Sequence, residues 1–252
     1  MSKGTLVGRW ARRLLSLYPL VLVACAWELA SRLGGIPPVF LPSLSTVLSR
    51  LWAATTSGEM PLSLGVSLYR TSIGLLIASV LGITLGLLTI QSKTLRWLSA
   101  PILRVGFPTP KIALLPLFTL WFGIDHASKI ALVAATCFFP FFVAAQSAAA
   151  GVSSKLVWAA LSLGTSRTGL LARVVLPASL PSIFSGLRVA VPMGLITVFT
   201  AEMLTGGGIG ENIILAQRYF ETDTVFAYLI VTVVVGYVLD DALSRYQKAI
   251  RQ

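Results

Sequence analysis

Hydrophobic residues in this chain are gathered into long blocks, and most charged residues fall in the segments between the blocks. An α-helix needs about 20 apolar residues to cross the hydrocarbon core of a bilayer. Six blocks have about this length, at residues 14–33, 64–90, 106–124, 127–149, 186–205 and 224–243. The pattern therefore predicts an all-α polytopic membrane protein with six transmembrane helices.

The segment between the first two blocks, residues 34–61, is rich in Gly, Pro and Ser. Residues 45–55 place four apolar side chains on one helical face, Val47, Leu48, Leu51 and Trp52. A short helix with one apolar face is typical of the membrane interface. We expect residues 1–252 to form a single transmembrane domain, with the first span and this interfacial helix in 1–59 and the core in about 60–245.

Small residues and prolines modify the predicted spans. Gly82 and Gly86 lie on one face of the second span and permit close helix contact, which we expect to be ordinary packing within one subunit. Prolines remove a backbone donor and favour kinks. They cluster near the start of the third span and occur inside the fourth and fifth, at Pro108, Pro110, Pro116, Pro140 and Pro192.

The composition agrees with a membrane location. Hydrophobic residues make up 56% of the chain and charged residues 12%, with a mean hydropathy of +0.84, whereas a soluble domain carries about 25% charged residues.

The net charge of +11 would suggest a nucleic-acid partner in a soluble protein. With the amino terminus inside, however, the termini and two loops hold most of the 20 basic residues: Lys3, Arg9, Arg12, Arg13, Lys93, Arg96, Arg104, Lys111, Lys155, Arg167, Arg173, Arg188, Arg245, Lys248 and Arg251. Cytoplasmic segments of membrane proteins are enriched in Lys and Arg. We therefore expect both termini in the cytoplasm, and no nucleic acid partner.

The basic start and the apolar run that follows it also resemble a signal peptide, and residues 22–25 resemble a lipoprotein cleavage site. Glu28 lies in the same apolar run and favours an uncleaved first span. Cys25 and Cys137 lie in apolar stretches without metal-ligand or redox spacing, so we expect two buried thiols.

Residues suited to catalysis are few. The sequence has no Gly-x4-Gly-Lys-Ser/Thr phosphate loop, so this chain alone should not bind ATP in the usual way. The lone histidine, His126, follows Asp125 at a predicted outer loop, where we expect it to be solvated. No cluster of His, Cys and carboxylates has metal-ligand spacing. We therefore expect a protein that is not an enzyme and holds no cofactor or metal.

Four charged residues lie within or close to the predicted spans: Glu28, Arg70, Arg188 and Glu202. Arg188 is near the cytoplasmic end of its span and can extend to the interface. Arg70 and Glu202 have opposite signs and lie in the outer parts of two spans. Because an unpaired charge in a bilayer is costly, we expect an ion pair. The alternative is that Arg70 faces a translocation path and attracts an anion.

Residues 154–191 are the most distinctive segment, because they are basic and lie between apolar blocks. We expect residues 154–163 to form a short helix capped by Ser153 or Ser154, ended by Gly164 and followed by a second helix capped by Ser166. Two short helices joined at a glycine would present a compact docking surface. The alternative is that the segment only links two spans.

Seven residues of this segment have a distinctive spacing: Trp158, Ala159, Ala160, Gly164, Val174, Leu176 and Pro177. In this register the segment resembles the cytoplasmic EAA loop of bacterial ABC importer permeases. Other stretches resemble the nitrate/sulfonate/taurine branch of the family: Trp27-Glu28, Leu41-Pro42-Ser43, residues 67–70, residues 110–125 and residues 201–204. The chain departs from the family at Trp158, where the family has Glu.

The resemblance implies the type I importer permease fold with a cytoplasmic coupling helix. It implies a permease in the bacterial inner membrane, present as two copies, with two ATPase subunits that bind ATP and Mg²⁺ and a periplasmic or lipid-anchored binding protein. The residues that would couple the permease to the ATPase are Trp158, Ala159, Ala160, Gly164, Leu176 and Pro177.

The resemblance further implies a small anionic solute such as nitrate, taurine or an alkanesulfonate. The alternative function is a stand-alone channel or ion-coupled secondary transporter, in which Glu28 and Glu202 could couple to an ion. No inverted repeat is evident in the sequence to support it.

Overall fold

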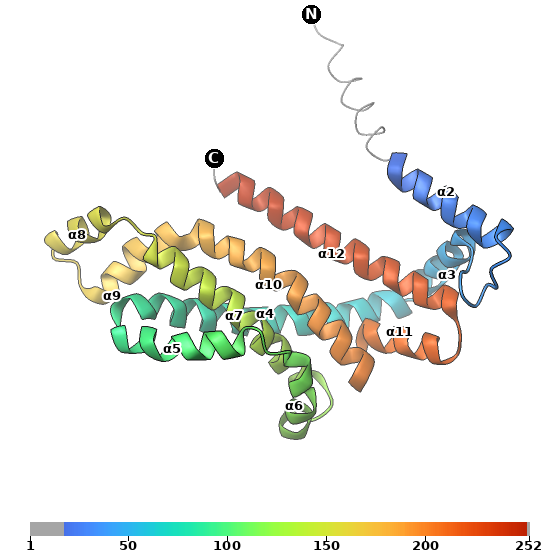
Figure 1. Cartoon of the computed structure of the whole chain (residues 1–252), viewed down its shortest axis with the longest axis horizontal. Coiled ribbons are helices and arrows are strands. Elements are labelled where there is room, and N and C mark those ends of the chain that lie inside the picture. Colours follow the sequence, from blue (N-terminus) through green and yellow to red (C-terminus); the bar gives the residue numbers. More distant parts are fainter. Residues whose placement is uncertain (1–17, 251–252) are drawn as a thin grey trace, which may run out of the picture. The chain divides into compact units, whose positions relative to one another are not determined.

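The computed structural model describes residues 18–250, with residues 91, 249 and 250 described by their backbone alone. Every regular element within this range is a helix (Figure 1). Five basic residues used to orient the chain, Lys3, Arg9, Arg12, Arg13 and Arg251, lie outside the described range, as does the start of the first predicted span. The chain divides into two compact units, Met1–Met60 with Ile213–Ile230, and Pro61–Asn212 with Val231–Gln252. The single-domain organisation stays a prediction.

The first unit contains α2 (Tyr18–Leu33), α3 (Leu44–Thr56) and parts of α11 (Gly208–Arg218) and α12 (Thr222–Ile250). The helix predicted at 45–55 is confirmed as α3. Its N-cap is Ser43, whose side chain accepts a hydrogen bond from the Thr46 N–H. Trp27 of α2 donates to the Pro42 carbonyl at 2.9 Å. The expectation of a buried Cys25 was wrong, because this part of α2 is exposed.

The second unit is built around α4 (Glu59–Gln91), α7 (His126–Ala150) and α10 (Leu176–Thr205), and Figure 1 shows α7 and α10 side by side. Its core contains Ala78, Val133, Cys137, Phe141, Ala190 and Val198. A Cβ at Gly82 would lie 2.8 Å from the Phe138 carbonyl oxygen, and one at Gly86 would lie 2.6 Å from that of Phe142. The expected glycine packing within one subunit is confirmed, because α4 contacts the backbone of α7 at both positions.

The third predicted span, 106–124, is not a single helix. The structure has an amphipathic helix α5 (Lys93–Gly106), a 3-10 turn η1 (Lys111–Leu114) and a short α6 (Leu115–Phe122), with a 94° bend between the two parts. Pro108 and Pro110 lie at the bend and cannot donate backbone hydrogen bonds, which explains why the helix breaks there. The basic residues of α5 made this segment resemble a loop in the sequence.

In the described part of the chain, four helices are long and apolar enough to cross a membrane: Glu59–Ile90, His126–Ala150, Arg167–Thr205 and Thr222–Lys248. The bent pair α5–α6 raises this number to five if it counts as one span. The span predicted at 186–205 begins earlier, since α10 starts at Leu176. The predicted outer loop after it contains α11, which the sequence analysis missed.

Candidate functional site

The 154–177 segment forms two short helices joined at a glycine, as expected from the sequence. The first, α8 (Ser154–Ser162), ends in a Schellman motif: the Thr165 N–H donates to the Ala160 carbonyl and the Gly164 N–H to that of Leu161, at 3.1 and 3.0 Å. Gly164 has φ +76°, a left-handed conformation that favours glycine. The second helix, α9 (Arg167–Leu170), is capped by Ser166, whose hydroxyl accepts from the Gly169 N–H.

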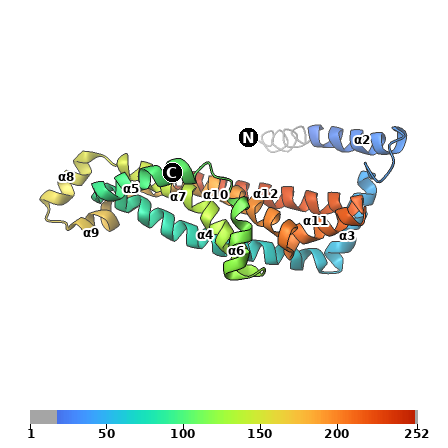
Figure 2. The ribbon, with the colours of Figure 1, turned by 60° about the horizontal axis from the view of Figure 1, so that its bottom comes forward.

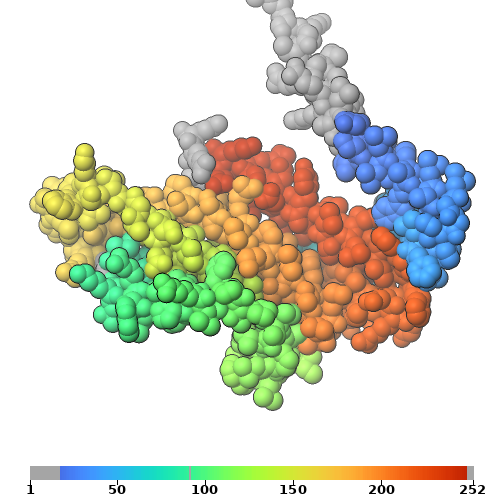
Figure 3. All heavy atoms as spheres, viewed as in Figure 1, coloured from blue at the N-terminus to red at the C-terminus, as the bar shows by residue number. Residues whose placement is uncertain are grey.

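The surface of α8 combines one large aromatic side chain with small residues. Figures 1 and 2 show α8 and α9 beyond the ends of α7 and α10, and Figure 3 shows their atoms uncovered. Trp158 is 72% exposed and Ala159 is also exposed, whereas Ala160 is buried. Of the three residues that occupy the Glu-Ala-Ala positions, only two are therefore available to a partner.

A π-helical turn, η2 (Leu171–Val175), joins α9 to α10. The Leu176 N–H donates to the Leu171 carbonyl, five residues earlier, instead of to the carbonyl four residues earlier. Pro177 explains this wide turn, because proline has no N–H to donate to the carbonyl of Arg173. The turn is fixed to the core of the unit by Val175, which is buried with Leu87, Ala145, Ala149 and Ile183. Leu176 packs against the same cluster, and Pro177 is exposed.

The structure brings Arg70 of α4 and Glu202 of α10 into direct contact. Arg70 Nη1 donates to Glu202 Oε1 at 2.7 Å, and the two side chains are 4% and 0% exposed. The other carboxylate oxygen of Glu202 accepts from the Ser67 hydroxyl at 2.7 Å and from the Gly210 N–H at 3.2 Å. The Ser67 hydroxyl in turn accepts from the Ile209 N–H at 3.0 Å. The amino-terminal end of α11 is thus bonded to the same buried carboxylate that pairs with Arg70, which suits the positive end of a helix dipole.

Three consecutive glycines cover this ion pair. Gly206, Gly207 and Gly208 have φ values of +84°, +80° and +77°. A Cβ at Gly207 would lie 2.7 Å from Arg70 Nη2, and one at Gly208 would lie 2.5 Å from the Ser67 hydroxyl. The loop therefore needs glycine for its backbone conformation and also for its close approach to the ion pair.

Two further side chains near this pair differ from expectation. His126 is not simply solvated, because its Nδ1 accepts a hydrogen bond from Arg70 Nε at 3.1 Å. Lys129 is buried, and its ammonium donates to the Ile124 carbonyl at 2.6 Å. Sequence reasoning missed Lys129 because this residue stands at the polar start of an apolar block, where a lysine usually reaches water.

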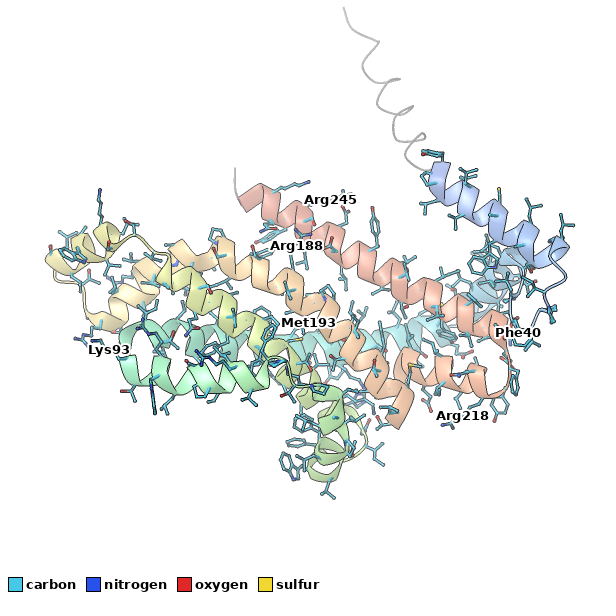
Figure 4. The ribbon with its side chains drawn as sticks, viewed as in Figure 1. Phe40, Lys93, Arg188, Met193, Arg218 and Arg245 are labelled. Carbon is cyan, nitrogen blue, oxygen red and sulfur yellow. The ribbon has the colours of Figure 1, made fainter. Side chains whose placement is uncertain are left out.

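Arg188 does not simply extend to the interface. Its guanidinium lies toward α12 (Figure 4) and contacts the Asp240 carboxylate at 3.0 Å. Both side chains are partly exposed. The sequence offered a weak signal for this pair, since Asp240 is an acidic residue near the end of the last apolar block. Glu28 is partly exposed and contacts Arg32 at 2.6 Å, so local groups account for its charge.

Over the described residues, the arrangement provides helix packing, a buried ion pair and two exposed short helices, and it brings together no set of catalytic side chains. Among residues 18–250, no group of three or more His, Cys, Asp and Glu side chains could hold a metal ion.

Comparison with known proteins gives consistent matches along the chain. Residues 78–252 match the family described as "Binding-protein-dependent transport system inner membrane component". The chain is 33% identical over 232 residues to SsuC of Bacillus subtilis, named as an aliphatic sulfonates transport permease, covering 92% of this chain and 83% of SsuC. It is 33% identical over 240 residues to the taurine transport system permease protein TauC of Escherichia coli, covering 93% and 87%.

The fold also matches a solved structure. A chain of the MetNI methionine ABC transporter aligns with a TM-score of 0.65 at 18% identity, covering 83% of this chain and 98% of that chain. This likeness shows the type I importer fold. These matches do not support a stand-alone channel or secondary transporter. The chain belongs to the family of binding-protein-dependent transport system inner membrane components, and is a multi-pass inner membrane permease of an ABC importer whose ATPase is a separate subunit.

Proposed function

We propose that this permease imports a small organic anion of the alkanesulfonate or taurine type. The observation that supports it is the 33% identity to SsuC and TauC, which extends over more than nine tenths of this chain. Another relative, ThiX of Halalkalibacterium halodurans, is named as a formylaminopyrimidine transport permease and is 30% identical over 225 residues. An uptake experiment must therefore distinguish a sulfonate-type solute from a formylaminopyrimidine, for which ThiX is named.

The experiment is uptake into proteoliposomes that contain the permease, its ATPase and its binding protein. We expect ATP-dependent uptake of taurine or ethanesulfonate, and competition by other short alkanesulfonates. Uptake of formylaminopyrimidine or nitrate with no uptake of either sulfonate would refute the proposed solute.

We infer that the 154–177 segment docks the ATPase. Exposed Trp158 supplies apolar contact area where the family has Glu, exposed Ala159 permits close approach, and Gly164 sets the angle between the two helices. The other three coupling residues support the segment from inside. Ala160 and Leu176 pack inward, and Pro177 widens the turn before α10. Co-purification of the ATPase with an Ala159→Glu permease tests this, and undiminished recovery would count against docking.

We propose that the chain crosses the membrane six times, with both termini in the cytoplasm. In this arrangement α2 lies in the first span and η1–α6 in the third, while the basic residues of α5 are on the cytoplasmic side. The distribution of Lys and Arg supports it.

The permease would act as two copies with two ATPase subunits below and a binding protein above. In that assembly the Arg70–Glu202 pair has a structural role within each copy, because its groups bond to each other and to α11. Labelling of single cysteines placed at Arg96 and Ser57 from each side tests the orientation.

A further inference from the structure

A cavity of about 410 Å³ lies between the end of α5, α7 and α10 of the second unit. Most of its wall is apolar, with Phe107, Val143 and Val189 among the lining residues. Its polar groups are serine hydroxyls, from Ser147 on α7 and from Ser182 and Ser185 on α10. Such a wall suits a solute with one polar end and a hydrocarbon part.

Gly186, one of the lining residues, allows α10 to pack closely against α7 beside the cavity. A Cβ at Gly186 would lie 2.5 Å from the Ala144 Cβ, so a larger side chain would push α10 away from α7. Ser182 and Ser185 are three residues apart and therefore lie on one face of α10, the face that lines the cavity. The Ser185 hydroxyl already accepts from the Gln247 amide at 3.1 Å. Ser147 and Ser182 are exposed, so their hydroxyls are available to a solute.

A buried cation stands next to this cavity. The Lys111 ammonium donates to the carbonyl of Phe107, a lining residue, at 2.6 Å, and lies 4.5 Å from the centroid of the Phe139 ring. Lys111 is 9% exposed, and among residues 18–250 no carboxylate lies within 4 Å of its ammonium. The charge of Arg70, in contrast, is balanced by Glu202.

A buried ionisable side chain with no carboxylate beside it is a functional-site candidate, because buried charges are normally paired. Aromatic faces and a carbonyl oxygen stabilise an ammonium without neutralising it. The positive potential of Lys111 therefore extends to the edge of the cavity, where a solute anion would complete the charge balance.

We propose that this cavity is a transient site for an amphipathic organic anion such as an alkanesulfonate. The hydroxyls of Ser147 and Ser182 donate to the sulfonate oxygens, Lys111 attracts the charge, and Phe107, Val143 and Val189 contact the hydrocarbon part. Two neutral hydroxyl donors and one ammonium that lies against an aromatic ring would bind an anion weakly. Weak binding suits a transport path, because the solute must leave each site. The proposal rests on the proposed function for its choice of solute class.

The test measures electrostatic preference inside the cavity with the assembled complex. In a Cys25→Ser background, Ser182→Cys supplies a reactive thiol, since the remaining Cys137 is buried. Its modification rate is compared for anionic methanethiosulfonate ethylsulfonate and for the cationic ethyltrimethylammonium analogue. We expect Lys111→Gln to lower the anion-to-cation rate ratio more than about a hundredfold, because a unit charge about 10 Å away at an effective dielectric constant of about 20 changes the rate of each reagent by more than about tenfold, in opposite directions.

Lys111→Arg keeps the charge and should preserve the ratio, which separates loss of charge from misfolding. Lys93→Gln is the matched control, because Lys93 stands at the opposite end of α5 (Figure 4) and should leave the ratio unchanged. An unchanged ratio in Lys111→Gln would overturn the proposal, and so would an equal fall in Lys93→Gln. A wild-type complex that imports no sulfonate would refute the proposed function separately, because the rate ratio is measured without transport.

Discussion

The buried ion pair between Arg70 and Glu202 gives the sharpest prediction on stability. Replacing Glu202 by Ala removes the carboxylate and leaves the Arg70 guanidinium buried, since the arginine side chain is only 4% exposed. Breaking a buried pair by removing one partner costs about 3–5 kcal/mol. The Ser67 hydroxyl and the Gly210 N–H also lose their acceptor, so the cost should lie toward the upper end of this range.

The assay uses the buried thiol of Cys137, which becomes reactive when the helices separate. In a Cys25→Ser background, a thiol-reactive dye reports thermal unfolding in detergent. By the scaling for chains of 150–250 residues, a loss of 3–5 kcal/mol lowers the midpoint by about 10 °C. Glu202→Gln retains hydrogen-bonding capacity but loses the charge, so its midpoint should lie between those of the wild type and Glu202→Ala.

The double variant Arg70→Met with Glu202→Leu distinguishes an orphaned charge from lost packing. Removing both charges leaves no buried ion, so the double variant should be more stable than Glu202→Ala. The reasoning fails if Glu202→Ala melts like the wild type, or if the double variant is the least stable of the set.

Three further predictions use the same complex or the same assay. Gly208→Ala should destabilise the protein by about 2 kcal/mol or more, because φ is +77° and the added Cβ would contact Glu202. Gly236→Ala on α12 is the control, since its Cβ meets open space and the change should be neutral or stabilising; equal unfolding midpoints for the two variants would contradict the prediction. Ser179→Ala should be neutral or should stabilise by about 1 kcal/mol, because its buried hydroxyl has no hydrogen-bond partner within residues 18–250; a clear loss of stability would show a bond that the structure lacks. Trp158→Ala should weaken ATPase binding by about 2 kcal/mol, about thirtyfold, as measured by titration of labelled ATPase, while the unfolding midpoint stays unchanged because the side chain is 72% exposed.

The sequence predicted the features that depend on local chemistry or on the bilayer. Hydropathy located the long helices because lipid requires about 20 apolar residues in a row. Gly164 and Ser166 have the positions at helix ends that were expected of them, whereas Ser153 stands at the N-cap of α8 without a side-chain hydrogen bond. The contact between Arg70 and Glu202 followed from depth and charge sign alone.

The features that the sequence did not reveal depend on tertiary contacts. The burial of Lys111 requires the rings of Phe107 and Phe139, which come from different helices. The pairing of Arg188 with Asp240 requires α10 and α12 to meet in a register that no local pattern encodes. Helix α5 was missed because basic and apolar side chains are mixed within a short segment, so the mean hydropathy of the segment did not indicate an apolar block.

The wide turn at Leu171–Val175 has a mechanical consequence. A regular α-helix resists bending because each turn is bonded to the next, and Pro177 lacks the N–H that would form one of those bonds. Compliance is therefore built into the covalent sequence at the entrance to a 30-residue helix. A torque on α8 and α9 would tilt α10 at this point before it could shift the whole helix along its axis.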